Sequence, residues 1–266
     1  MLRALSLTAL LLASSALSAQ AAIAPVEQVS ASTETAPVLT TSQEWRRMAE
    51  AGSAYPLFAV ERERVEGLVR AAMAQGVNVP TPRDPGGGYT HEQHKRNYQA
   101  IYNAGALYRL TGDKAYADFA RDLLLEYAKP YPTLGAHPAG RGQIPGRLFW
   151  QTLNDSVWLV YSVQGYDAIR EALTLEERRR IDDDVFRRMA SFLSSETPEN
   201  FERIHNHATW AVAGVGMTGY VLRDRDLSDK ALTGLKKDGS AGFLTQIDQL
   251  FSPDGYYEEG PYYQRY

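Results

Sequence analysis

Three polar side chains stand together where a loop meets a small-residue helix. His205, Asn206 and His207 precede a run of alanine, valine and glycine. His205 or Asn206 can be explained as a helix cap, because asparagine is favoured there. A cap accounts for one of these three polar side chains and leaves the other two unexplained. Donors grouped at a helix N-terminus favour an anion, since the free backbone amides and the helix dipole point the same way. The pattern therefore indicates an anion-binding site.

A second candidate is the tyrosine-rich end of the sequence, residues 255–266. Glycine and proline interrupt any helix there, which predicts a loop or irregular turn. Aromatic residues usually belong to the core, and some of these tyrosines do. Tyrosines beside Glu258, Glu259 and Arg265 also suit a wall that binds sugars, because the ring is apolar and its tip is polar.

Two further patterns point to other chemistries. Residues 91–94, His-Glu-Gln-His, resemble a zinc-protease helix only loosely, because the histidines are three residues apart instead of four. We expect a solvated helix start there, no metal site and no cofactor. The carboxylates of Asp254, Glu258 and Glu259 leave open a glycoside hydrolase, whose mechanism needs a carboxylate pair across the scissile bond.

The elements that must position these residues are predicted to be helices, and strand signals are nearly absent. Apolar periodicity and capping residues predict helices from residue 41 onward, over 58–75, 90–110, 114–129, 148–172, 175–193, 207–221, 226–235 and 243–250. Residues 77–88 and 130–146 are predicted long loops. The fold class is therefore all-α. Hairpins joined alternately by short turns and long loops suit a toroid of helix pairs whose loops build a cleft. A plain helical bundle is the alternative.

The first residues predict export. Arg3 precedes an apolar run and a signal-peptidase site at Ala19-Gln20-Ala21, and the run is too short to span a bilayer permanently. We predict a signal peptide over residues 1–22, a flexible leader over 23–40 and one helical domain over 41–266. Localisation would be the periplasm or the medium, without a membrane anchor. The absence of cysteine excludes lipidation and disulfides.

The charge balance restricts the partners. The formal net charge is -4, and nothing suggests the concentrated basic surface that nucleic acid requires. An acidic protein binds a polyanion only through a local basic cleft, for which Arg141, Arg147 and Arg203 are candidates. No pattern predicts an oligomeric state.

Four motifs resemble the helical domain of oligoalginate lyases in the heparinase II/III-like polysaccharide lyase superfamily. They are Asn206-His207-x-x-Trp210, residues 251–257, residues 260–263 and the Arg-Leu-Phe-Trp-Gln of residues 147–151. The resemblance implies an incomplete α/α toroid of antiparallel helix hairpins. In the family this toroid continues into an antiparallel β-sheet domain, which we expect to be absent here.

The resemblance implies an exo-acting lyase that cleaves alginate oligosaccharides by β-elimination. Asn206 and His207 would hold and neutralise the uronate carboxylate. Tyr263 would exchange a proton with the leaving oxygen. Arg265 would bind a substrate carboxylate, which its planar fork suits better than lysine.

Gln151, Tyr257 and Arg147 are expected to contact the substrate in subsites. A further tyrosine and other binding residues of the family come from beyond residue 266, so the activity of this chain alone stays open. The alternatives are a glycosaminoglycan lyase of the same superfamily and a non-catalytic glycan-binding fragment.

Overall fold

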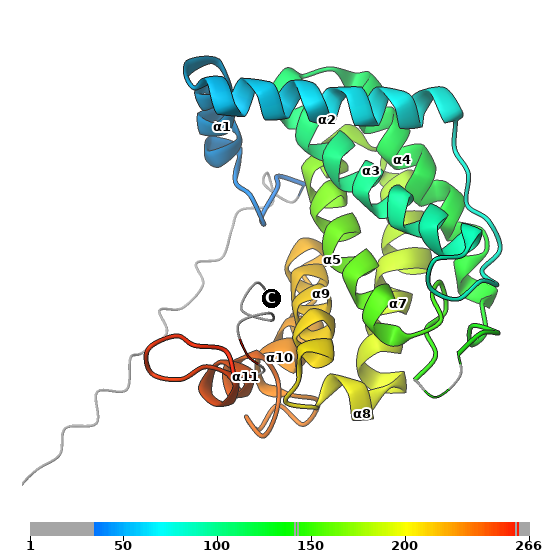
Figure 1. Cartoon of the computed structure of the whole chain (residues 1–266), viewed down its shortest axis with the longest axis vertical. Helices are drawn as coiled ribbons and strands as arrows, with labels where there is room; N and C mark the ends of the chain where they lie inside the picture. Colours follow the sequence, from blue (N-terminus) through cyan, green and yellow to red (C-terminus); the bar gives the residue numbers. More distant parts are fainter. Residues whose placement is uncertain (1–34, 141, 143, 259, 261–266) are drawn as a thin grey trace, which may run out of the picture. The chain divides into compact units, whose positions relative to one another are not determined.

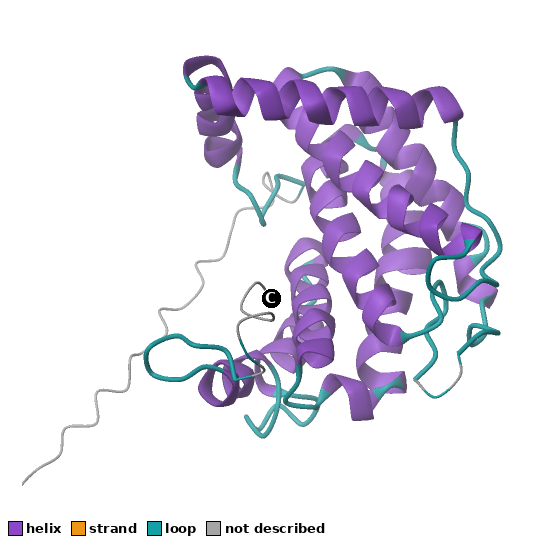
Figure 2. Cartoon of the chain, in the orientation of Figure 1, coloured by secondary structure: helices purple, strands orange, loops and turns teal. Residues whose placement is uncertain are grey.

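Helices carry nearly all the regular structure of this chain. The computed structural model describes residues 35–140, 142, 144–258 and 260, and these residues form no β-strand. The helices in chain order are α1 (Ser42–Ala54), α2 (Pro56–Gln75), α3 (Tyr89–Thr111), α4 (Lys114–Ala128), α5 (Thr152–Ile169), α6 (Leu175–Ile181), α7 (Arg188–Ser191), α8 (Pro198–Phe201), α9 (Asn206–Leu222), α10 (Arg225–Thr233) and α11 (Phe243–Leu250). The predicted all-α class is confirmed (Figure 2).

Three long helices, α3, α5 and α9, lie side by side and form an inner row (Figure 1). The next helix in the chain packs against two of them, α4 against α3 and α10 against α9. Consecutive helices therefore pair as hairpins, and the hairpins share one row of inner helices. This is the arrangement predicted for an incomplete α/α toroid.

The N-terminal ends of the inner helices lie at the same end of the row. His91, in the first turn of α3, has its ring 5.0 Å from that of Phe149, which lies just before α5. Arg147 of the same segment contacts Glu196 at 2.7 Å, shortly before α8. Helix α8 lies next to the start of α9 (Figure 1). The loops that enter the three helices are therefore gathered together, as the sequence predicts.

Small residues set the spacing within the inner row. A Cβ on Gly105 of α3 would lie 2.6 Å from the carbonyl oxygen of Gly165 of α5, and a Cβ on Gly165 would collide with the carbonyl of Ile101. On the other side of α5, a Cβ on Gly214 of α9 would lie 3.2 Å from Leu159. Larger side chains at the first two positions would push α3 and α5 apart.

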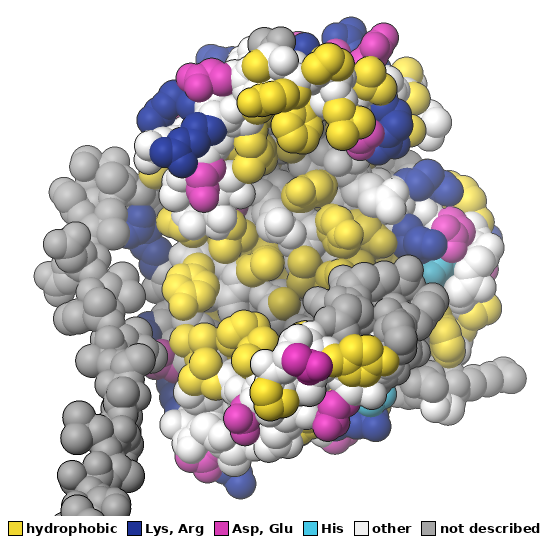
Figure 3. Space-filling view, turned by 60° about the vertical axis from the view of Figure 1, so that its left-hand side comes forward, with side chains coloured by type: hydrophobic (Ala, Val, Ile, Leu, Met, Phe, Trp, Pro, Cys, Tyr) yellow, Lys and Arg dark blue, Asp and Glu magenta, His cyan; other side chains and the backbone are white. Residues whose placement is uncertain are grey.

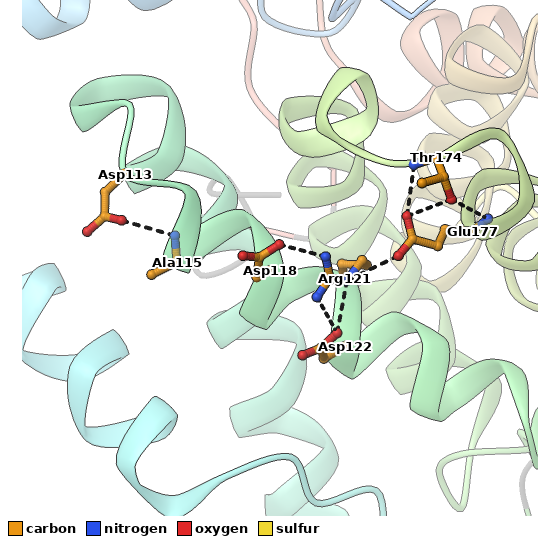
Figure 4. Close-up of polar contacts among 7 residues, drawn as sticks. All are labelled: Asp113, Ala115, Asp118, Arg121, Asp122, Thr174 and Glu177. Carbon is orange, nitrogen blue, oxygen red and sulfur yellow. Dashed lines mark hydrogen bonds and ion pairs between the residues drawn. The ribbon is translucent and has the colours of Figure 1, made fainter.

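The outer helices α4 and α6 are joined by a network around Arg121 (Figure 4). Its guanidinium contacts Asp118 at 2.6 Å and Asp122 at 2.9 Å on α4, and Glu177 of α6 at 3.4 Å. Glu177 also completes a capping box with Thr174, which starts α6. Surface ion pairs contribute at most about 1 kcal/mol each. The network therefore mainly fixes how α6 begins against α4.

Two of the predicted helices differ from the structure by more than two residues at one end. The helix expected over residues 148–172 begins at Thr152. The helix expected over 175–193 extends to residue 196, because π-helical turns over Asp182–Arg187 and Phe192–Glu196 interrupt the α-helix without ending it. The sequence analysis did not predict α8.

The last residues of the predicted leader contact α5. Asp167 of α5 accepts backbone hydrogen bonds from Val38 at 3.0 Å and Leu39 at 2.8 Å, so these two residues are held against the inner row. The predicted signal peptide, residues 1–22, lies outside the described residues. Within the described part of the chain, every helix is too short or too polar to cross a membrane.

Apolar side chains are exposed on two helices at opposite ends of one face. On α2, Leu57 and Val60 are exposed, and on α11 Leu244 and Ile247 are exposed. Figure 3 shows hydrophobic side chains spread over the face between these ends.

Candidate active site

The first turn of α9 carries the two residues expected to do the chemistry. His205 is the N-cap, and its Nδ1 accepts a hydrogen bond from the backbone N–H of His207 at 3.3 Å. Of the two capping candidates, the structure therefore selects His205. Asn206 begins the helix and is buried, whereas His207 is half-buried, with its ring 4.9 Å from that of His205.

An amide and an imidazole thus stand at the positive end of a helix of 17 residues. The unpaired N–H groups of a helix N-terminus and the aligned peptide dipoles favour a negative charge there. The small residues that follow let α9 pack closely on α5, which fixes the direction in which this end points. The arrangement suits a carboxylate.

A buried carboxylate shapes the segment that enters α5. Asp155 accepts backbone hydrogen bonds from Leu148 at 3.0 Å, Arg147 at 3.2 Å and Phe149 at 3.4 Å. These bonds hold residues 147–149 in a loop, which is why the predicted helix start at Leu148 is wrong. Burial raises the pKa of Asp155 to about 7, and the three N–H donors partly oppose this rise. The sequence analysis missed Asp155, although a carboxylate in the first turn of a helix is a capping signal.

Gln151 is the last residue before α5. Its side-chain amide donates to Asn154 Oδ1 at 3.0 Å, and the residue is half-buried. The amide is therefore held near the N-terminal end of the inner row, beside the segment that Asp155 fixes. Its role in substrate binding stays a prediction.

The expectation of a solvated start for α3 is wrong. His91 is 5% exposed and His94 is fully buried. Both rings pack edge-on against Phe149, and His94 Nδ1 lies 2.8 Å from the hydroxyl of Tyr127. Burial, followed by the nearby His137 and His91, lowers the pKa of His94 to about 3. These histidines are neutral packing residues that join α3 to the segment before α5.

Arg147 forms an ion pair with Glu196. Besides its ion pair with Glu196, its guanidinium lies 4.7 Å from the ring centre of Phe192. Arg147, Arg188 and Glu196 line a cavity of about 290 Å³. Neither Asn206 nor the neighbouring histidine is among the residues that line it. Of the other two arginines expected to form a basic cleft, Arg203 is exposed and Arg141 lies outside the described residues.

The tyrosine-rich end is described only in part. Tyr257 is 1% exposed, and its ring lies 5.2 Å from that of Phe251, with which it forms an isolated antiparallel bridge. Tyr256 is exposed. The expected proton-transfer residue Tyr263 and the expected carboxylate-binding Arg265 lie outside the described residues. The roles of Tyr257, Tyr263 and Arg265 stay predictions.

An aromatic strip crosses the inner row next to Asn206. It consists of Tyr98 and Tyr102 from α3, Tyr161 from α5 and Trp210 from α9. The ring of Tyr161 lies 5.1 Å from Tyr98, 5.5 Å from Tyr102 and 6.5 Å from Trp210. The sequence analysis did not identify this strip. The available signal was the four-residue spacing of Tyr98 from Tyr102 and of Asn206 from Trp210, which puts each pair on one helix face.

Comparison with known proteins agrees with the resemblance. A family model described as alginate lyase matches residues 23–260. A protein named alginate lyase from Stenotrophomonas maltophilia (strain K279a) is 62% identical over 263 residues, which cover 96% of this chain and 35% of that protein. An exo-oligoalginate lyase from Saccharophagus degradans (strain 2-40) is 58% identical over 229 residues, which cover 86% of this chain and 31% of that protein. This chain therefore spans about a third of the length of the curated relatives it matches.

Proposed function

This chain belongs to the alginate lyase family, and we propose that it acts in the cleavage of alginate oligosaccharides by β-elimination. The observation that carries the proposal is the placement of Asn206 and His207 in the first turn of α9, beyond a cap supplied by His205. An amide and an imidazole at a positive helix end form a site for the carboxylate of a uronate.

The chemistry depends on that carboxylate. A uronate carries it on C5, and the C5 proton is weakly acidic because its loss adds charge next to an existing anion. Asn206 and His207 hydrogen-bond and neutralise the carboxylate, and the α9 dipole adds to this stabilisation. After the proton leaves C5, the C4–O4 bond breaks, a C4=C5 double bond forms, and the departing oxygen takes up a proton. No water is added to the sugar.

The remaining roles rest on the resemblance. Tyr263 removes the C5 proton and returns a proton to the leaving oxygen, and Arg265 binds a substrate carboxylate. Gln151 and Tyr257 contact neighbouring sugar units. Arg147 binds a further carboxylate only in competition with Glu196, with which it is paired in the structure.

Ultraviolet absorbance of unsaturated uronates tests this proposal. The chain, a Tyr263→Phe variant and a Tyr220→Phe control are incubated with alginate oligomers and, separately, with a glycosaminoglycan. We expect absorbance to rise with alginate for the chain and the control. The Tyr263→Phe rate should be lower by about 10²- to 10⁴-fold, the usual contribution of a positioned proton donor or acceptor.

Other results would point elsewhere. A rise only with the glycosaminoglycan would identify a different lyase of the same superfamily. New reducing ends without absorbance would identify a hydrolase. Binding that tolerates Tyr263→Phe, with no turnover by either protein, would identify a glycan-binding fragment.

A further inference from the structure

The tyrosines of the aromatic strip have hydroxyl groups that the fold does not use. Within the described part of the chain, the hydroxyls of Tyr98, Tyr102 and Tyr161 make no hydrogen bond. Tyr102 and Tyr161 are only half-buried. None of these three oxygens is among the buried side-chain atoms that lack a partner, so solvent reaches them. By contrast, the hydroxyl of Tyr127, a buried tyrosine on the outer helix α4, is bonded to both Asn97 and His94.

The hydroxyls of Tyr98 and Tyr102 remain neutral donors over the ordinary pH range. Burial, and then the neighbouring hydroxyl of Tyr161, raise the pKa of Tyr98 to about 12 and also raise the pKa of Tyr102. A phenol that keeps its proton can donate to a carboxylate or to a sugar hydroxyl. The hydroxyl of Tyr161, on the adjacent helix α5, belongs to the same cluster of rings.

The strip leads directly to the candidate active site. Trp210 follows Asn206 by four residues, so it lies on the same face of α9, about 6 Å further along the helix. From there the strip crosses two helix–helix spacings, each about 8–10 Å, to reach the tyrosines of α3. It therefore extends well beyond the size of one sugar unit.

We propose that the aromatic strip binds uronate units of an acidic oligosaccharide that lie beyond the unit held by Asn206 and His207. The apolar faces of the sugar rings pack against the aromatic rings, and the tyrosine hydroxyls donate to their carboxylate and hydroxyl oxygens. This inference rests on the proposed function, because it takes the first turn of α9 as the position of the reacting unit.

Calorimetric titration with alginate oligomers of two and six units tests the proposal. The Tyr161→Phe and Tyr102→Phe substitutions each remove one hydroxyl and keep the ring. The control is Tyr220→Phe, an exposed tyrosine on α9. All titrations use a Tyr263→Phe background, so that the ligand is not consumed.

We expect each strip variant to bind the six-unit oligomer about 2- to 10-fold more weakly than the control, which corresponds to one hydrogen bond. The two-unit oligomer, held near Asn206, should bind equally well.

The outcomes separate this inference from the proposed function. Equal affinities of the strip variants and the control for the long oligomer would overturn the strip as a binding surface. An equal loss for both oligomers would also overturn it, because it would indicate a general disturbance of the inner row. If neither oligomer bound to any of the proteins, the strip would also be overturned as a binding surface. The absorbance assay on the chain with an intact Tyr263 decides separately whether the lyase proposal stands.

Discussion

At the scale of single residues, the histidines of α3 contribute through burial rather than through catalysis. His94 is fully buried and its pKa is lowered to about 3, while an unfolded histidine titrates near 6.5. Between these values the unfolded chain binds a proton that the folded chain does not. Stability from this group is therefore complete above pH 6.5 and is lost as the pH falls.

We expect a His94→Asn substitution to reduce the pH dependence of unfolding. For the parent, the free energy of unfolding should fall by about 2 kcal/mol between pH 7 and pH 5 because of His94 alone. Asparagine can keep a hydrogen bond to Tyr127 but does not titrate. Urea unfolding at both pH values measures the difference between the two proteins.

Comparing the parent with His94→Asn cancels the contributions that other titrating groups make to the pH dependence of unfolding. The pKa values of His91 and His137 are also lowered, and that of Asp155 is raised, so Asp155 changes stability in the opposite direction over this window. All three are present in both proteins. Equal pH slopes for parent and variant would show that the pKa of His94 is not lowered in the folded state.

At the scale of elements, the spacing between α3 and α5 depends on glycine. We expect Gly165→Ala to lower the free energy of unfolding by about 1–3 kcal/mol, because the added methyl would collide with the carbonyl of Ile101. The matched control is Gly67→Ala on α2, where a Cβ would meet nothing within 4 Å. That change should raise stability by up to about 1 kcal/mol, since alanine favours a helix more than glycine does.

Thermal or urea unfolding of both variants measures these effects. Their opposite signs identify packing as the cause, because helix propensity alone would stabilise both variants. If Gly165→Ala were as stable as the parent, the inner row would not be as closely packed as the structure has it. A shifted inner row would also displace α9, so the proposed lyase activity should fall together with stability in Gly165→Ala alone.

At the scale of the whole molecule, we propose that the chain is exported. The mature protein should begin near residue 23 and be recovered from the periplasm or the medium, which N-terminal sequencing of the secreted material measures. Leu11→Arg interrupts the apolar run that a signal peptide needs, so this variant should stay in the cytoplasm uncleaved. Cytoplasmic recovery of the parent with Met1 in place would contradict the proposal.

Local patterns in the sequence determined which elements form and which residues begin them. Thr41 and Glu44 form a capping box at the predicted start of the first helix, and α11 has the predicted bounds Phe243–Leu250, because these features depend on neighbours within one turn. The start of α9 was predicted to within one residue, so Asn206 and His207 lie at a helix N-terminus as expected. Caps and periodicity are local, and a sequence displays them directly.

Only the tertiary structure decided what depends on distant residues. The carboxylate of Asp155 delays the start of α5, because it binds backbone groups up to eight residues earlier in the chain. His94 is buried because Phe149 and Tyr127 cover it, not because of its own neighbours in sequence. The aromatic strip joins three helices that are far apart along the chain. Long-range packing brings these groups together, and one-dimensional spacing does not record it.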